Sequence, residues 1–189
     1  MLIPLGFLAG SGGVAGDYEL IETYILGSSQ SSITFSNLGD YSSTYKHLQI
    51  RAVAKSTNSG AEQTTLLTYN GDTTTTNYRA HQLYGFNGSV GSADTISFAR
   101  QMIGYTARAD VTNVFGAIVI DILDPYSTTK NTTARSLSGN VAGTGANAVV
   151  NLQSHLYINT DAISSATLAP LAGGNFIAGS RFSIYGVRG

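Results

Sequence analysis

Short alternations of apolar and polar residues, separated by turn-forming residues, run along most of this chain. The clearest lies in residues 47–55 (HLQIRAVAK), where every second position from Leu48 to Ala54 is apolar and only Val53 breaks the polar set between them. A period of two puts alternate side chains on opposite faces of a strand. The segment therefore predicts an antiparallel strand that is buried on one face and faces water on the other.

Similar segments recur roughly every 10–17 residues and predict about eleven strands. The others are expected over residues 18–26, 32–35, 64–69, 78–86, 95–103, 113–123, 132–137, 148–159, 163–168 and 181–187. Strands 78–86 and 95–103 would pair through a Gly/Ser loop over residues 87–93. Segment 113–123 (NVFGAIVIDIL) is almost continuously apolar, which predicts a central strand buried on both faces.

These strands predict an all-β fold, a single antiparallel β-sandwich of jelly-roll type with an extended N-terminal arm. The composition agrees, because only 11% of residues are charged, against about 25% in typical domains. Long surface helices need charged residues on their wet face, so we expect less than about 10% helix. The sandwich is assigned to residues 17–189 and the arm to residues 1–16. The expected core includes Leu20, Leu48, Ile50, Leu66, Ile118, Ile120, Ile122, Phe182 and Ile184.

The arm has a composition of its own. An apolar tip is followed by a glycine-rich stretch of the kind that behaves as a loose coil. The tip is either an edge strand that folds back on its own core or an arm that docks on a neighbouring subunit. The glycines separate it from the first strand, which favours docking. The predicted partner-binding residues are Leu2, Ile3, Leu5, Phe7 and Leu8.

Charge and cysteine content exclude several classes of protein. The net charge is −1 and no basic run is present, so nothing predicts nucleic-acid binding. Cysteine is absent, which excludes disulfides and thiolate chemistry. No apolar run approaches the roughly 18–20 residues that span a bilayer, so no membrane association is expected. The N-terminus lacks the basic region of a signal peptide.

No catalytic pattern stands out. His47, His81 and His155 fall on three different predicted strands, and neither a zinc-binding spacing nor a G-x-S-x-G elbow occurs. Most carboxylates fall in turns, where they cap backbone amides. Asp121 interrupts an apolar strand and is expected to be buried and bonded to an arginine or to turn amides. We predict a protein that is not an enzyme and has no cofactor and no metal.

The eleven tyrosines raise a second possibility, since a tyrosine in a loop offers a stacking surface for sugars. Tyrosine also anchors sandwich corners and subunit seams, and tryptophan, the commonest sugar platform, is absent. Those near predicted turns are Tyr41, Tyr45, Tyr69, Tyr78, Tyr84, Tyr105 and Tyr126.

Several segments together resemble a family of small virion structural proteins from tailed bacteriophages of the aquatic and cyanophage type. The resemblance covers almost the whole chain, and its motifs are structural rather than catalytic. It is carried by IPLGFLAG (3–10), YELIETYIL (18–26), YKHLQIR (45–51), NGD (70–72), NY (77–78), HQLYG (81–85), DILD (121–124) with Tyr126, Lys130 and Thr132, and RFSIYG (181–186).

This resemblance implies a component of the virion and leaves two positions open. One is a capsid cement or decoration protein that stabilises the lattice of the major capsid protein. The other is a tail, fibre or receptor-binding module that contacts host surface glycans. The short single domain and the docking arm favour the capsid surface. We expect a homo-oligomer, a trimer, because outward residues such as Val53 and Tyr185 would otherwise stay exposed.

Overall fold

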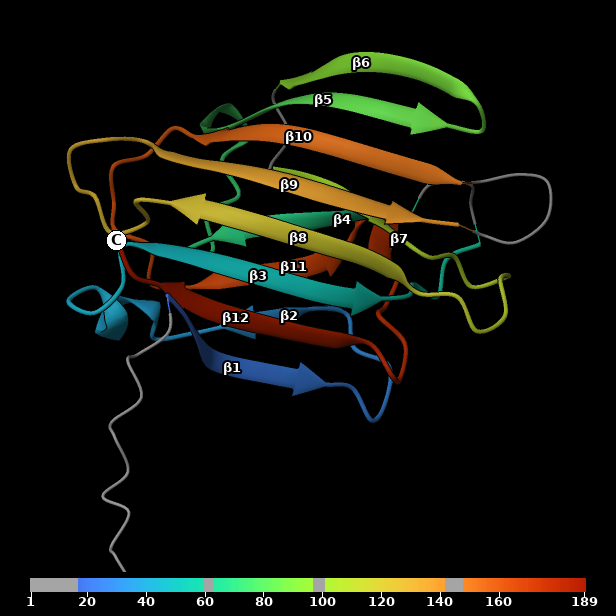
Figure 1. Cartoon of the computed structure of the whole chain (residues 1–189), viewed down its shortest axis with the longest axis horizontal. Coiled ribbons are helices and arrows are strands. Elements are labelled where there is room, and N and C mark those ends of the chain that lie inside the picture. The colour runs from blue at the N-terminus through green and yellow to red at the C-terminus, as the bar shows by residue number, and fades with distance from the viewer. Residues whose placement is uncertain (1–16, 60–62, 97–100, 142–147) are drawn as a thin grey trace, which may run out of the picture.

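The computed structural model describes residues 17–59, 63–96, 101–141 and 148–189. These residues form two antiparallel sheets that lie face to face (Figure 1). The strands are β1 (Tyr18–Ile25), β2 (Ile33–Phe35), β3 (His47–Ala54), β4 (Gln63–Tyr69), β5 (Tyr78–Phe86), β6 (Ser89–Ile96), β7 (Gln101–Thr106), β8 (Gly116–Leu123), β9 (Thr132–Asn140), β10 (Val149–Tyr157), β11 (Ala166–Pro170) and β12 (Arg181–Val187). Three single 3-10 turns, η1 (Leu38–Tyr41), η2 (Thr75–Asn77) and η3 (Leu171–Gly173), are the helical elements of the described residues.

The strand order is that of a jelly roll enlarged by two hairpins. The larger sheet runs β1-β12-β3-β8-β9-β10-β5-β6 and the smaller one β2-β11-β4-β7. Without the hairpins β5–β6 and β9–β10, the first remaining strand lies beside the last and the second beside the second-last, as in a jelly roll. The all-β sandwich is thus confirmed. The two hairpins form an extension (β9, β10, β5 and β6) that widens the larger sheet on one side only (Figure 1).

The hydrophobic core lies between the two sheets, as the alternating patterns predict. Leu48, Ile50 and Ala52 point inward from β3, and Ile118, Ile120 and Ile122 do so from the neighbouring β8. Phe182 and Ile184 of β12 complete this face and are fully buried. Eight of the nine predicted core residues are therefore correct.

The ninth, Leu20, is wrong. Its side chain is exposed, because a β-bulge between Leu20 and Glu22 shifts the register of β1 against β12. An extra residue in one strand reverses the face on which every later side chain lies. Ile21 and Tyr24 pack on the core instead.

The predicted pairing of residues 78–86 with 95–103 is also wrong. β5 turns tightly at Asn87-Gly88, both with positive φ, and pairs directly with β6, which occupies most of the expected loop. Asn-Gly is a strong signal for such a two-residue turn. The Ser-, Gly- and Ala-rich strand after it has low β-propensity, which hid it from the pattern. β7 then begins at Gln101 and belongs to the other sheet.

The inner face of the extension is polar although it is buried. Asn151, Gln153 and His155 follow one another along the inward face of β10, and each is almost inaccessible to solvent. Asn151 Nδ2 donates to Gln82 Oε1 over 2.7 Å, and His155 Nε2 lies 2.9 Å from the Ser136 hydroxyl. The apolar core thus continues into a polar layer beneath β9, β10 and β5.

Candidate protein interface

The outer face of the larger sheet carries a row of apolar side chains that no described residue covers. Val119, Leu137, Leu152 and Leu83 stand opposite one another on β8, β9, β10 and β5. The row beside it contains Val150 and Val90, with Gly85 paired to both. We call these six residues, Leu83, Val90, Val119, Leu137, Val150 and Leu152, the apolar strip; their exposed fractions range from 36% to 87%.

Val53, Ala117 and Gly139 continue the second row toward the middle of the sheet. Val53 was expected to face outward, and it is exposed. Tyr185 is only half-buried by its neighbours, and the guanidinium of Arg51 lies 4.8 Å from the centre of its ring. Scattered apolar residues are normal on a protein surface, whereas a contiguous set rimmed by polar groups marks an interaction site.

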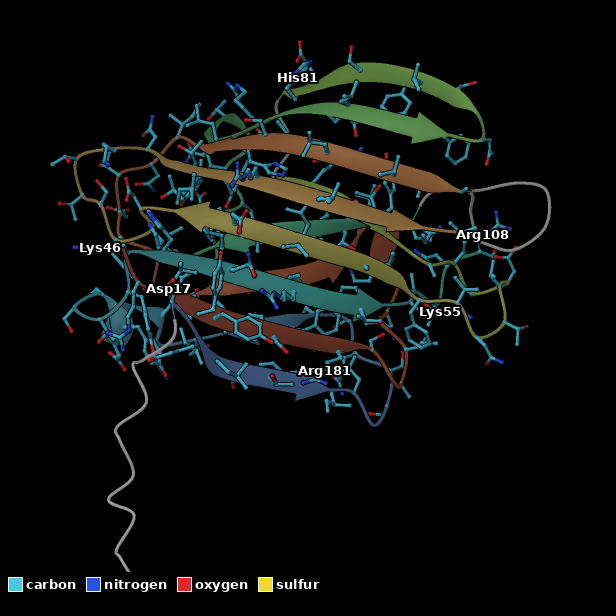
Figure 2. All side chains as sticks on the ribbon, in the orientation of Figure 1. Asp17, Lys46, Lys55, His81, Arg108 and Arg181 are labelled. Atoms are coloured by element: carbon cyan, nitrogen blue, oxygen red, sulfur yellow. The ribbon has the colours of Figure 1, made fainter. Side chains whose placement is uncertain are left out.

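An ordered polar row forms that rim. It consists of residues paired across six strands, Gln49, Asp121, Arg135, Ser154, His81 and Asp94. Gln49 Nε2 donates to Asp121 Oδ1 over 2.7 Å, and Arg135 Nε lies 3.2 Å from Asp121 Oδ2. These bonds hold the rim in place beside the apolar rows. Figure 2 shows His81 at the edge of the sheet formed by β5 and β6.

The predicted and the observed burial of β8 differ. It is a central strand, as predicted, but its pattern alternates and only one face lies in the core. Val119 and Leu123 point outward and are exposed, and Asp121 between them is half-buried and bonded to Arg135 and Gln49. The prediction of burial on both faces is therefore wrong for the single chain. The predicted bond of Asp121 to an arginine is confirmed.

The strip contains a shallow groove where β10, β5 and β6 meet. The side chains of Leu83, Val90, Val150 and Leu152 surround it. Its floor is the backbone of Gly85, which has no side chain to fill the space. Its volume is about 260 Å³, and only apolar atoms face it. A Cβ at Gly85 would lie 3.3 Å from Val150 Cγ1, so even alanine would crowd this floor.

Asp72, a carboxylate outside the strip, makes structural contacts. Asp72 accepts hydrogen bonds from Asn77 Nδ2, the Thr74 amide and the Tyr157 hydroxyl at 2.7–2.9 Å. Burial alone would raise its pKa, but these donors outweigh burial and lower the pKa of Asp72 to about 2. A carboxylate so engaged anchors the turn before β5.

The tyrosines considered as sugar platforms are mostly internal. Tyr69, Tyr78 and Tyr157 are fully buried in one cluster, with ring centres 5.0–5.3 Å apart along it. Tyr45 is buried as well and donates to Glu19 Oε2 over 2.5 Å. These rings stabilise the sandwich rather than present a stacking surface.

A polar pocket of about 340 Å³ lies beside η1 and the start of the β8–β9 loop. Its lining includes Lys46, Asp124, Tyr126 and Lys130. Asp124 is already paired with Lys130 and lies 3.6 Å from His47 Nδ1. The two opposite charges of this pocket, Asp124 and Lys130, thus pair with each other, whereas the buried hydroxyl of Tyr126 has no hydrogen-bond partner among the described residues.

The three histidines remain apart, on β3, β5 and β10, and no set of metal-binding side chains gathers within the described ranges. In the same part of the chain no helix has the length and apolarity needed to cross a bilayer. The predicted docking residues Leu2, Ile3, Leu5, Phe7 and Leu8 lie outside the described residues. Comparison with protein-family models, curated proteins and solved structures gives no match for this chain.

Proposed function

We propose that this chain is a non-enzymatic structural protein of a bacteriophage virion, a cement or decoration protein on the capsid surface. In this role its copies associate into a homotrimer, and the trimer binds and stabilises the lattice of the major capsid protein. The resemblance of the sequence to phage virion proteins supports the setting. The apolar strip on the outer face of the larger sheet is the observation that supports self-association.

Burial of the strip supplies the driving force for that association. Fully burying one large aliphatic side chain contributes about 1.5–3 kcal/mol. The six residues of the strip are already partly covered within one chain, so we expect about half of that value from each. The ordered polar row beside the strip, with Asp121 and Arg135 already paired, adds few unpaired charges to be desolvated.

The alternative role, a tail or receptor-binding module that contacts host glycans, has weaker support. Its best site is the polar pocket beside η1, where Asp124 is already paired with Lys130. The position is tested by detecting the protein in virions from which the tails have been removed. We expect it on the tailless capsids; its presence only in the tail fraction would contradict the capsid role and support the alternative.

Introducing charge into the strip tests the self-association. The double variant Leu137→Asp with Leu152→Asp is expected to dissociate the oligomer in sedimentation velocity and to be lost from capsids, because three linked weak contacts hold far better than one. Both side chains are exposed, so the fold should persist. Thr133→Asp, on the same face of β9 but outside the strip, is the matched control and should remain oligomeric.

A further inference from the structure

The groove lies next to an open sheet edge. β6 is the last strand of the larger sheet, and along its outer side no described strand pairs with it. Its sequence, SVGSADTI, contains one charged residue, Asp94, and neither lysine nor proline. Natural proteins usually protect such edges with charges, prolines or bulges. The opposite edge, β1, has that protection in Glu19, Glu22 and a bulge.

The chain itself contains a segment that fits this edge. Residues 2–8 read LIPLGFL, and in an extended conformation Ile3, Leu5 and Phe7 fall on one face. No charge occurs in this segment, as suits a groove faced only by apolar atoms. Pro4 lacks an amide donor, which an added edge strand tolerates.

We propose that residues 2–8 of a second copy of this chain add to β6 as an extra strand and place Ile3, Leu5 and Phe7 on the outer face of the sheet, beside Val90 at the border of the groove. Main-chain hydrogen bonds to the open edge would provide affinity, and apolar contact with Val90 would provide specificity, as in other strand-addition complexes. This inference rests on the proposed self-association and names the segment that mediates it.

The arm cannot serve the groove of its own chain. Ile25 and Val90 end one continuous row of paired residues that crosses all eight strands, so seven spacings of about 4.8 Å separate the two edges by about 34 Å. Asp17, where the arm begins, lies a further eight residues back along β1, about 26 Å at the usual rise of a strand. Figure 2 shows Asp17 at the start of β1, toward one edge of the sheet, and His81 near the opposite edge.

The linker between the apolar segment and Asp17 is too short for that path. Nine Cα–Cα steps lead from Leu8 to Asp17, and at no more than about 3.6 Å each they span at most about 32 Å. Even the distance straight across the sheet is longer. The occupant of the groove therefore comes from another copy, and each copy gives one arm and receives one. Such a head-to-tail arrangement closes into a ring when the rotation between copies allows it.

The inference is tested with purified protein and needs no virion. A chain lacking residues 1–16 is mixed with a fluorescent peptide of residues 1–12, and binding is measured by anisotropy. We expect saturable binding, with the amides of β6 gaining protection from hydrogen exchange. Val90→Asp should weaken binding by about tenfold or more, because a charge would stand beside the apolar side chains of the added strand. Ile25→Asp, also exposed at the other end of the same row, should leave it within about twofold.

A peptide with Ile3, Leu5 and Phe7 replaced by serine should not bind. The inference is overturned if the truncated chain associates as strongly as the full chain, if Val90→Asp binds the peptide normally, or if binding leaves β6 unprotected. Circular dichroism of each variant shows whether it is folded. If the peptide does not bind, strand addition is wrong but self-association through the apolar strip can still hold. A full chain that stays monomeric would contradict both strand addition and self-association.

Discussion

Replacing Ile50 with alanine is expected to lower the free energy of unfolding by about 2–4 kcal/mol. Ile50 is fully buried in the middle of β3 and stands between Ile120 of β8 and Ile184 of β12. The truncated side chain would leave a cavity that three neighbouring strands, joined by continuous ladders, cannot close. Urea unfolding followed by circular dichroism measures the loss.

Val53→Ala is the matched control for this change, since Val53 lies on the same strand but faces outward. Its effect on unfolding of the isolated chain should stay within about 0.5–1 kcal/mol. Equal losses for the two variants would mean that the core is not where the two sheets meet.

Acid is expected to destabilise the protein through His155 well before its carboxylates protonate. Burial lowers the pKa of His155 from 6.5 to about 3. Between these values the unfolded chain binds a proton that the folded chain does not, so stability is greatest above pH 6.5 and falls as the pH falls toward 3. The slope approaches about 1.4 kcal/mol per pH unit over most of this range.

His155→Gln keeps a polar group near the Ser136 hydroxyl and removes the titration. Urea unfolding at pH 7, 5.5 and 4.5 should show a steep loss for the natural chain and a nearly flat profile for this variant. Equal slopes for the natural chain and His155→Gln would contradict the assignment. Below about pH 4 protonation of Asp72 lowers the free energy of unfolding further. The pKa of Asp72 is lowered because its hydrogen bonds favour the ionised carboxylate, and this stabilisation disappears when the carboxylate is protonated.

Strands with one face in the core could be predicted from the sequence. In β3 apolar and polar residues alternate except at Val53, because water on one side and the core on the other select residues of opposite polarity. β6 could not be found in this way. It lies at an edge with small residues on both faces, so it lacks a hydrophobic period. The bulge in β1 was hidden for a different reason, since its register depends on pairing with β12.

The candidate interface is visible in the sequence only as a strand that is apolar on both faces, β8. The apolar residues on both faces of β8 predict burial on both faces, whereas Val119 and Leu123 are exposed in the single chain. Leu137 and Leu152, on the outward faces of β9 and β10, likewise lack a covering layer. Strands that are apolar on both faces, in a sheet that the chain covers on one face only, are what the proposed association with another chain would select. The alignment of these apolar residues into one row across the sheet depends on how the strands pair, which the sequence does not show.

The polar inner layer of the extension divides the molecule into regions of unequal local stability. Around Asn151, Gln153 and Ser136 less apolar surface is buried than around Ile50 and Ile120, so opening the extension exposes less surface that water disfavours. The amide hydrogens of β5 and β10 should therefore exchange with solvent through local opening, whereas those of β3 and β12 should exchange only through global unfolding. The half of the sheet that bears the groove is thus expected to open locally while the jelly roll stays folded.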